Sequence, residues 1–143
     1  DARYNGDCMG TNMAGDYSHE NRFETCYLET PPLDLTTLTS PIAMFYHYVN
    51  TETSQDGGII QYFDSTSSDW VRIGDGMLDP DYDPYSVGGV HAYSGHQTSE
   101  GWHPVYVDLS TFAGETVTLR FAFYSDASVT YEGWYIDEFI VFD

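Results

Sequence analysis

The segment TVTLRFAFYSDASVTYEGWYIDEFIVF, residues 116–142, contains two apolar runs separated by a polar loop. In residues 116–124, alternate side chains on one face are apolar, namely Val117, Leu119, Phe121 and Phe123. This alternation is typical of a strand with one buried face. Residues 134–142 carry apolar groups on both faces, which favours a central strand covered on both sides. We therefore predict two antiparallel strands in a hairpin, joined by a loop at residues 125–133.

Similar short runs of β-branched and aromatic residues precede this segment. They occupy residues 42–49, 59–63, 70–73 and 102–109, while residues 110–114 favour one helical turn. Several short strands joined by turns predict an all-β protein, specifically a two-sheet antiparallel β-sandwich or jelly roll. The length of 143 residues fits a single domain over residues 1–143.

Residues 1–30 lack this pattern and are expected to form an irregular N-terminal segment, which contains Cys8 and Cys26. A disulfide between the two would close a loop of about 19 residues and stabilise the fold by about 3 kcal/mol. It would also indicate an oxidising, extracellular compartment, so we expect a secreted protein. Two free buried thiols remain the alternative, while a zinc site is disfavoured because the cysteines do not form close pairs.

The charge balance excludes several classes of partner. Asp and Glu total 23, Lys and Arg total 4, and the formal net charge is −19. Phosphate groups would be repelled, so nucleic acids and anionic membrane surfaces are poor partners. No apolar stretch approaches the roughly 20 residues that span a bilayer, and a hydrophobic fraction of 41% is too high for a disordered chain. Because the first residue is Asp rather than Met and no basic, apolar leader is present, we expect either a mature product or an excised piece of a larger chain.

Six segments in a fixed order carry a resemblance to a known family: GTNMAGDY (10–17), YLETPPLDLT (27–36), FYHYVNTETSQDGG (45–58), SSDW (67–70), VDLSTFAGETVTLRFAF (107–123) and SDASVTYEGWYIDEFIVF (125–142). The chain resembles the MAM-like jelly-roll modules at the ends of secreted bacterial proteins, including immune-inhibitor-A-type metallopeptidases. The resemblance implies a jelly roll that serves as an accessory module, is often stabilised by calcium and has no active site of its own.

Four acidic residues are candidate calcium ligands. Glu52 and Asp56 lie in one polar loop, while Asp126 and Asp137 lie at the two ends of the loop of the last predicted hairpin. Calcium binds about six to eight oxygen atoms in loose geometry, and a divalent cation would remove the repulsion between these carboxylates. In the alternative interpretation, Glu52 is a solvated charge, Asp56 forms a turn and Asp126 caps the backbone. Asp137 would then be a buried carboxylate held by backbone amides or by Arg120.

Residues 75–101, DGMLDPDYDPYSVGGVHAYSGHQTSEG, form a long excursion between predicted strands. Connections of this length are usually functional or flexible. Its aromatic residues alternate with carboxylates, and flat rings beside hydrogen-bond acceptors suit sugar ligands. The candidate carbohydrate-binding residues are Tyr82, Tyr85, Tyr93 and Trp102. The alternative is that these rings pack the excursion onto the sheet.

The sequence contains no HExxH or GxSxG motif, so an enzyme is disfavoured. The first hypothesis is a non-catalytic, calcium-stabilised extracellular module for adhesion, assembly or substrate targeting, with another extracellular protein as its partner. The second is a carbohydrate-binding module with a glycan ligand. The third is a structural subunit of an extracellular fibre or surface layer.

Overall fold

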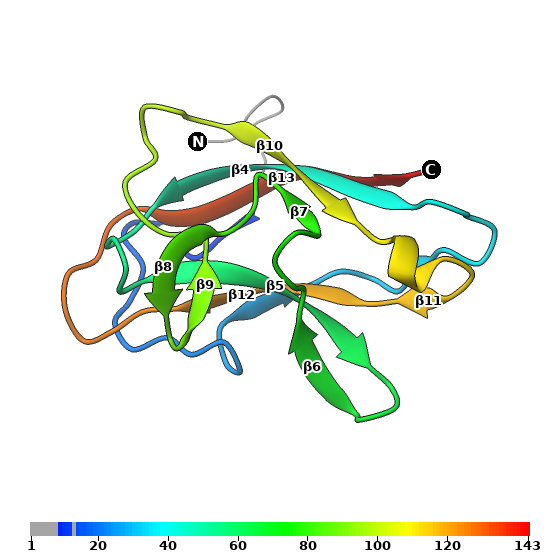
Figure 1. The fold of residues 1–143 in the computed structure, drawn as a ribbon. Helices are drawn as coiled ribbons and strands as arrows, with labels where there is room; N and C mark the ends of the chain where they lie inside the picture. Colours follow the sequence, from blue (N-terminus) through cyan, green and yellow to red (C-terminus); the bar gives the residue numbers. More distant parts are fainter. Residues whose placement is uncertain (1–8, 13) are drawn as a thin grey trace.

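The computed structural model describes residues 9–12 and 14–143, which form two stacked antiparallel β-sheets (Figure 1). The five-stranded sheet has the order β1 (Met9–Gly10), β13 (Gly133–Phe142), β4 (Ile42–Asn50), β10 (His103–Asp108) and β7 (Leu78–Asp79). The four-stranded sheet has the order β2 (Tyr27–Glu29), β12 (Leu119–Tyr124), β5 (Gly57–Asp64) and β6 (Asp69–Arg72). The predicted all-β sandwich is confirmed.

Two small sheets and one short helix accompany the two layers. One small sheet pairs β3 (Leu33–Asp34) with β11 (Thr116–Val117), and the other pairs β8 (Asp83–Val87) with β9 (Val90–Ala92). The predicted helical turn is the 3-10 helix η1 (Ser110–Phe112). In the part of the chain that the structure describes, the edge strands of the main sheets are short, with 2 residues in β1, 2 in β7, 3 in β2 and 4 in β6.

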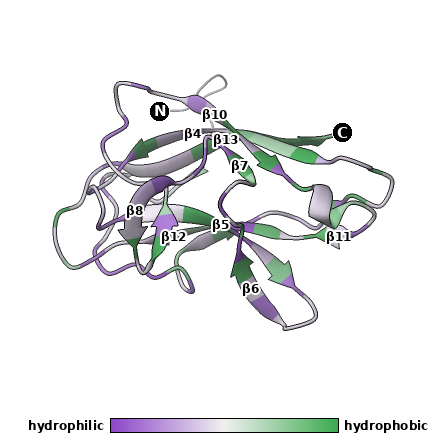
Figure 2. Cartoon of the chain, viewed as in Figure 1, coloured by the Kyte–Doolittle hydropathy of each residue, from purple (hydrophilic) through white to green (hydrophobic). Residues whose placement is uncertain are grey.

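The core lies between the two layers, and β4 shows how the alternating pattern fills it. The core-facing side chains of this strand, Ala43, Phe45, His47 and Val49, are all 0% exposed. The intervening residues lie on the outer face and are half-buried. Apolar residues gather along the strands of both layers, whereas the loops are mostly polar (Figure 2). Burial of one strand face against another sheet is the main stabilising contribution to such a sandwich.

The last strand contains a β-bulge at the two acidic residues that interrupt its apolar pattern. The register of β13 against β4 shifts between Asp137 and Ile140. Within this bulge, Glu138 has a φ of 55°, in the left-handed region that residues other than glycine rarely adopt. A bulge adds a residue to one strand and re-aims the side chains beyond it. The polar interruption therefore coincides with a backbone irregularity.

The predicted hairpin over residues 116–142 is wrong. Its first run divides into β11 and β12, and β12 belongs to the four-stranded sheet while β13 belongs to the five-stranded sheet. Residues 125–132 therefore cross from one layer to the other. Alternation identified both strands as half-buried or buried, but it carries no information about which neighbour each strand pairs with.

The predicted excursion at residues 75–101 contains β7 and a hairpin of β8 and β9 whose turn is formed by Gly88 and Gly89, both with positive φ. Two isolated bridges, Gly58 with Tyr93 and Asn50 with His96, attach the following residues to the ends of β5 and β4. The segment is therefore packed on the sandwich. In residues 1–30, the described part contains the short strands β1 and β2, which sequence periodicity missed because two or three residues show no period.

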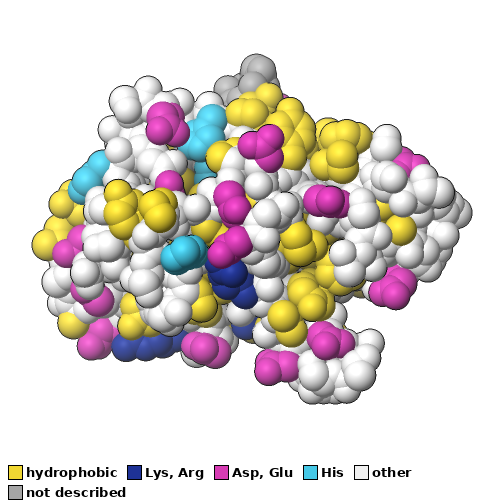
Figure 3. Space-filling model, viewed as in Figure 1, with side chains coloured by type: hydrophobic (Ala, Val, Ile, Leu, Met, Phe, Trp, Pro, Cys, Tyr) yellow, Lys and Arg dark blue, Asp and Glu magenta, His cyan; other side chains and the backbone are white. Residues whose placement is uncertain are grey.

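The charged side chains of the surface are mostly acidic. Figure 3 shows Asp and Glu side chains spread over the visible face, whereas basic atoms occupy only small areas. Cys26 is half-buried, and its predicted partner Cys8 lies outside the described residues, so the disulfide stays a prediction. Within residues 9–12 and 14–143, we find no helix with the length and apolarity needed to cross a membrane.

Candidate metal centre

Strand pairing brings two of the predicted ligands together at one end of the sandwich. Asp56 directly precedes β5, and Asp126 follows the end of β12. Because these strands are antiparallel and Tyr124 pairs with Gly57, the residues just beyond the pair lie next to each other. The backbone N–H of Asp126 donates a hydrogen bond of 2.8 Å to Oδ1 of Asp56.

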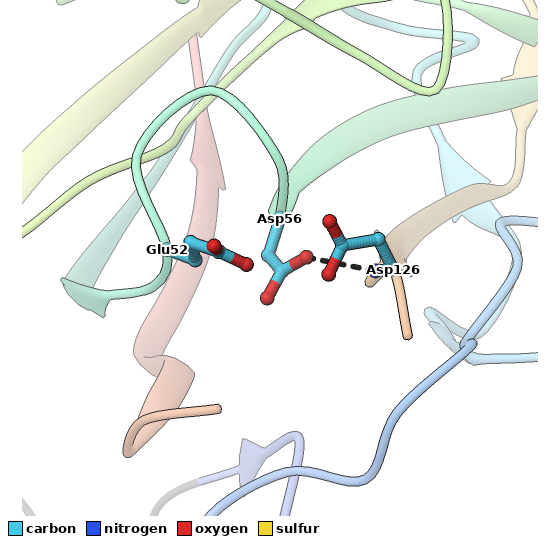
Figure 4. A group of neighbouring side chains, drawn as sticks. All are labelled: Glu52, Asp56 and Asp126. Atoms are coloured by element: carbon cyan, nitrogen blue, oxygen red, sulfur yellow. Dashed lines mark hydrogen bonds between the residues drawn. The ribbon is translucent and has the colours of Figure 1, made fainter. Parts of the chain in front are cut away.

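The third carboxylate comes from the turn that precedes Asp56. The backbone N–H groups of Gln55 and Asp56 both donate to the carbonyl oxygen of Glu52, which folds residues 52–56 into a tight turn. Each of Glu52, Asp56 and Asp126 offers a carboxylate oxygen, and these oxygens lie within 4.8 Å of one another. In Figure 4, the side chain of Asp56 lies between those of the other two.

Hydroxyl groups hold these carboxylates in place. Tyr17 donates from its hydroxyl to Oδ2 of Asp56 at 2.7 Å and accepts the backbone N–H of Glu52 at 3.2 Å. Ser128 donates from its hydroxyl towards Oε2 of Glu52 at 2.8 Å and Oδ1 of Asp126 at 2.7 Å. Sequence reasoning missed both residues. Tyr17 lies in a segment without periodicity, and Ser128 lies in an ordinary polar loop.

The three carboxylates differ in their electrostatic surroundings. Asp56 is 0% exposed, and burial raises its pKa, with smaller raising contributions from the charges of Asp126 and Glu52. Hydrogen bonds from Ser128 lower the pKa of Asp126. Burial also raises the pKa of Tyr17, which keeps its hydroxyl protonated as a donor to Asp56. A proton and a cation therefore compete for the buried carboxylate of Asp56.

The described arginines are engaged elsewhere. Arg72 forms an ion pair with Asp75, Arg22 lies over the ring of Tyr124, and Arg120 lies between two aromatic rings. The sequence contains four basic Lys and Arg residues in total. In residues 9–12 and 14–143, the hydrogen bonds and ion pairs of the three carboxylates include none to an arginine.

The structure does not bring the fourth predicted ligand, Asp137, into this group. It lies inside β13 opposite Tyr46, whereas the start of that strand, Gly133, pairs with Asn50 beside the loop. Its Oδ1 accepts a hydrogen bond of 2.8 Å from the backbone N–H of Glu138. Since β12 and β13 belong to different sheets, no hairpin places Asp137 beside Asp126.

The donor set fits a hard cation. Calcium binds oxygen at roughly 2.4 Å, so two oxygens on opposite sides of one ion lie about 4.8 Å apart. The three carboxylates fall within that limit. All three donors are oxygens, which suits calcium or magnesium better than a metal that prefers sulfur or imidazole. Glu52, Asp56 and Asp126 are thus the residues that could hold a metal ion.

The four aromatic residues of the predicted carbohydrate site do not form one surface. Tyr82 and Tyr93 are core residues with exposures of 7% and 2%. Tyr85 is 38% exposed, and Trp102 is half-buried against the ring of Tyr48. Two of the four rings are therefore buried in the core, as the alternative interpretation expects.

A separate polar pocket lies beside Tyr85. It has a volume of about 450 Å³, and Tyr85, Asp81, Asp83, His96, Gln97 and Glu100 are among its lining residues. Asp83 accepts hydrogen bonds from the backbone N–H of Ser94 and from Gln97, and burial raises its pKa. An exposed ring beside carboxylate, imidazole and amide groups is a suitable lining for a polyhydroxylated ligand.

The comparisons with known proteins place the chain near parts of bacterial peptidases. No protein-family model matches it. The chain is 26% identical over 134 residues to Bacillopeptidase F of Bacillus subtilis (strain 168). This matched region covers 94% of this chain and 8% of that protein. It is 43% identical over 56 residues to Pre-pro-metalloprotease PrtV of Vibrio cholerae serotype O1 (strain M66-2). This matched region covers 39% of this chain and 6% of that protein. The chain therefore spans less than a tenth of the length of these relatives, and it is similar to a small part of each.

Proposed function

We propose that this chain is a non-catalytic β-sandwich module of a larger extracellular protein, stabilised by calcium at Glu52, Asp56 and Asp126. Its role is to support adhesion, assembly or substrate targeting by the protein that contains it. The resemblance to MAM-like jelly-roll modules and the similarity to small parts of two peptidases support an accessory role. The disulfide between Cys8 and Cys26 belongs to the same proposal.

The observation that carries the calcium assignment is the convergence of three carboxylates around a fully buried one. Asp56 is 0% exposed, and its pKa is raised mainly by burial, with smaller contributions from the charges of Asp126 and Glu52. Like charges so close together are unfavourable unless a proton or a cation neutralises them. At neutral pH, a divalent cation at this point would offset most of the negative charge of the group and join the loop before β5 to the segment after β12.

The test is the thermal stability of the intact chain with and without calcium. An ion that binds only the folded state stabilises it by about 2.7 kcal/mol when its concentration is 100-fold above Kd. A chelator should therefore lower the Tm by several degrees, and added calcium should restore it. Magnesium at equal ionic strength is the control, because it requires near-octahedral geometry and releases its waters reluctantly. Equal rescue by both ions, or no effect of the chelator, would contradict the proposal.

Variants locate the effect. Asp56→Asn should abolish most of the response to chelator, because it removes a charged ligand and keeps the shape of the side chain. Asp137→Asn is the matched control, because Asp137 lies in β13 away from the three carboxylates. It should respond to chelator as the unmodified chain does. A loss of response in Asp137→Asn alone would place the ion elsewhere.

A second candidate function is glycan binding at the polar pocket, and Tyr85 is the observation that favours it. This residue is 38% exposed and lines a pocket of about 450 Å³. Replacement of Tyr85 with alanine should weaken binding on a glycan array without changing the Tm. Tyr106→Ala is the control, since that ring is 39% exposed on another strand. Equal binding by the two variants would remove this candidate.

A further inference from the structure

Three ring side chains form a continuous hydrogen-bonded chain inside the sandwich. Nε1 of Trp134, in β13, donates to Nδ1 of His47, in β4, at 3.0 Å. Nε2 of His47 lies 2.9 Å from Nε2 of His103, in β10. Nδ1 of His103 lies 3.1 Å from the carbonyl oxygen of Gly101. This chain crosses three neighbouring strands and ends at the loop that precedes β10.

The two ends of the chain assign every proton within it. An indole N–H can only donate, so Nδ1 of His47 accepts, and its ring proton is on Nε2. A carbonyl oxygen can only accept, so Nδ1 of His103 carries a proton and Nε2 of that ring is bare. Both assignments agree that Nε2–H of His47 donates to Nε2 of His103. Both histidines are therefore neutral in this arrangement.

A further proton cannot enter this arrangement without breaking a hydrogen bond. On Nδ1 of His47 it would face the indole N–H of Trp134. On Nε2 of His103 it would face the N–H of His47, only 2.9 Å away. Two donors that face each other repel, and the fully buried His47 has no water to turn towards.

The surroundings of the two rings differ in charge. Phe45, His103, Tyr93 and Trp134 surround His47, and the hydroxyl of Tyr93 donates to the carbonyl of Pro80. Burial, and secondarily His103, hold the pKa of His47 well below its ordinary value of 6.5. His103 is 19% exposed at its side chain, and its Nε2 lies 3.8 Å from Oε2 of Glu100. A positive charge on the His103 ring would also lower the pKa of the Asp83 carboxyl.

The same geometry argues against a metal at this pair. A histidine that binds a metal through Nε2 normally carries its proton on Nδ1 and donates it to an oxygen. Here Trp134 donates to Nδ1 of His47, so binding through Nε2 would require an imidazole without any ring proton. The arrangement of Trp134, His47 and His103 therefore suits hydrogen bonds between neutral rings.

We propose that the His47–His103 pair is an acid-sensitive latch that ties residues 93–103 to the sandwich at neutral pH and releases them when His103 takes a proton. The protonated ring of His103 turns away from His47 and towards Glu100 and Asp83. This exchange replaces a buried hydrogen bond with an ion pair at the pocket.

The latch acts on a segment that also contacts the candidate metal loop. Ser94 donates from its hydroxyl to the carbonyl oxygen of Asp56 at 2.6 Å. Gly95 exchanges hydrogen bonds with Thr51, whose backbone N–H donates to the carbonyl of Gly95 and whose hydroxyl accepts the N–H of Gly95. Release of this segment therefore loosens the wall of the polar pocket and one side of the loop that contains Asp56.

The sign of the pH effect follows from the excluded protons. In the latched state every ring nitrogen of the pair is already used in a hydrogen bond, so neither ring can take a further proton, whereas both rings can in the unfolded chain. The contribution of the latch to stability is therefore fully present above about pH 6.5 and is lost as the pH falls below that value. For each excluded proton, the folding equilibrium constant falls by up to about tenfold per pH unit.

The experiment measures chemical unfolding of the intact chain between about pH 7.5 and 5.5, a window chosen around the histidine pKa. His103→Gln keeps a hydrogen-bond acceptor for His47 and removes one of the two rings that can take a proton. As the pH falls below about 6.5, the folding equilibrium constant of this variant should therefore fall less steeply than that of the unmodified chain, by up to about tenfold per pH unit. His96→Gln is the matched control, because His96 is an exposed histidine of the same segment. It should retain the full pH dependence. A pH dependence of His103→Gln equal to that of the unmodified chain would overturn the latch.

The series is run both with excess calcium and with chelator, which separates the latch from the metal site. The difference between His103→Gln and His96→Gln should appear in both conditions, whether or not calcium stabilises the fold. Its loss in the presence of either calcium or chelator would assign the effect to the metal site and contradict the proposal.

Nitrogen-15 NMR of the histidine rings in the unmodified chain provides a readout that does not depend on any variant. At alkaline pH, His47 should carry its proton on Nε2 and His103 on Nδ1. On acidification, His103 should become doubly protonated as the hydrogen-bonded Nε2–H signal of His47 is lost. Any other tautomer assignment, or an Nε2–H signal that persists while His103 is doubly protonated, would refute the latch.

Discussion

Tyr17 shows how a single hydroxyl can organise an acidic site. It donates to the carboxylate of Asp56 and accepts the backbone N–H of Glu52, so it fixes two of the three candidate ligands from a distant part of the chain. The ring is 2% exposed and packs edge-on against Phe123, with centroids 4.9 Å apart. The hydroxyl position is therefore set by core packing.

We predict that Tyr17→Phe destabilises the calcium-free chain by about 1–3 kcal/mol, because it leaves a buried carboxylate oxygen and a backbone N–H without their partner. The measurement is urea unfolding in the presence of chelator. Tyr106→Phe is the control, since that tyrosine is 39% exposed, and it should be nearly neutral. Equal stability of the two variants would show that the hydroxyl of Tyr17 contributes little.

At Gly58, the backbone approaches a core ring so closely that no side chain fits. A Cβ atom at this position would overlap the ring of Trp134, while the backbone is fixed by its hydrogen bonds with Tyr93. We predict that Gly58→Ala destabilises the fold by about 1–3 kcal/mol, the usual effect of overpacking a core. Gly74→Ala, where a Cβ would meet no atom within 4 Å, should stay near zero. Denaturant midpoints of the two variants provide the comparison.

At the scale of elements, Arg120 connects all four strands of the second sheet. The residue lies in β12, and its guanidinium carbon is 4.4 Å from the ring centroid of Tyr27 in β2 and 4.4 Å from that of Trp70 in β6. Its Nε donates to Gln61 of β5 at 2.6 Å. The side chain is thus a planar layer between two rings, which explains how a charged residue can be 6% exposed although it forms no ion pair with a carboxylate among residues 9–12 and 14–143.

Replacement of Arg120 with lysine keeps the charge but removes the planar group that stacks on both rings. We predict a loss of about 1–2 kcal/mol in unfolding free energy, since cation–π contacts are stronger where the cation is desolvated. Arg22→Lys is the matched control, because Arg22 is exposed over a single ring at 4.9 Å. If both variants lose the same stability, stacking is not what holds Arg120.

The elements also show what sequence can and cannot reveal. The longer strands β4, β5, β10, β12 and β13 were predictable because their runs of apolar, β-branched and aromatic residues have a physical cause, the burial of one or both strand faces. The short strands β1, β2, β7, β8 and β9 were missed because their pairing depends on distant segments. The proximity of Asp56 to Asp126 follows from the pairing of β5 with β12, which periodicity does not specify. The predicted convergence of their two loops is supported, whereas Asp137 was placed with them only by assuming a hairpin that does not form.

At the scale of the whole molecule, charge is the dominant property. The formal net charge of −19 is spread over a small surface, and the described arginines are largely engaged in contacts with aromatic rings. Self-repulsion of this kind opposes the compact state.

We predict that sodium chloride raises the Tm in the presence of chelator, most steeply between about 0.01 and 0.1 M, where the screening length falls from about 30 to 10 Å. Differential scanning calorimetry measures the change. An uncharged osmolyte at equal osmolality is the control for general solvent effects. A Tm that stays flat or falls as salt increases would show that repulsion among the carboxylates does not limit the fold.

The short edge strands affect how the protein behaves at high local concentration. A long open edge exposes a row of backbone donors and acceptors that can template the strands of a neighbouring copy. Within residues 9–12 and 14–143, each main sheet ends in strands of only 2 to 4 residues, while the central strands β4 and β13 have 9 and 10. Copies of the module held side by side on a surface or in a concentrated matrix would therefore have few edge backbone groups with which to pair strands between copies. The fold therefore resists amyloid-like self-association through its outline as well as through its charge.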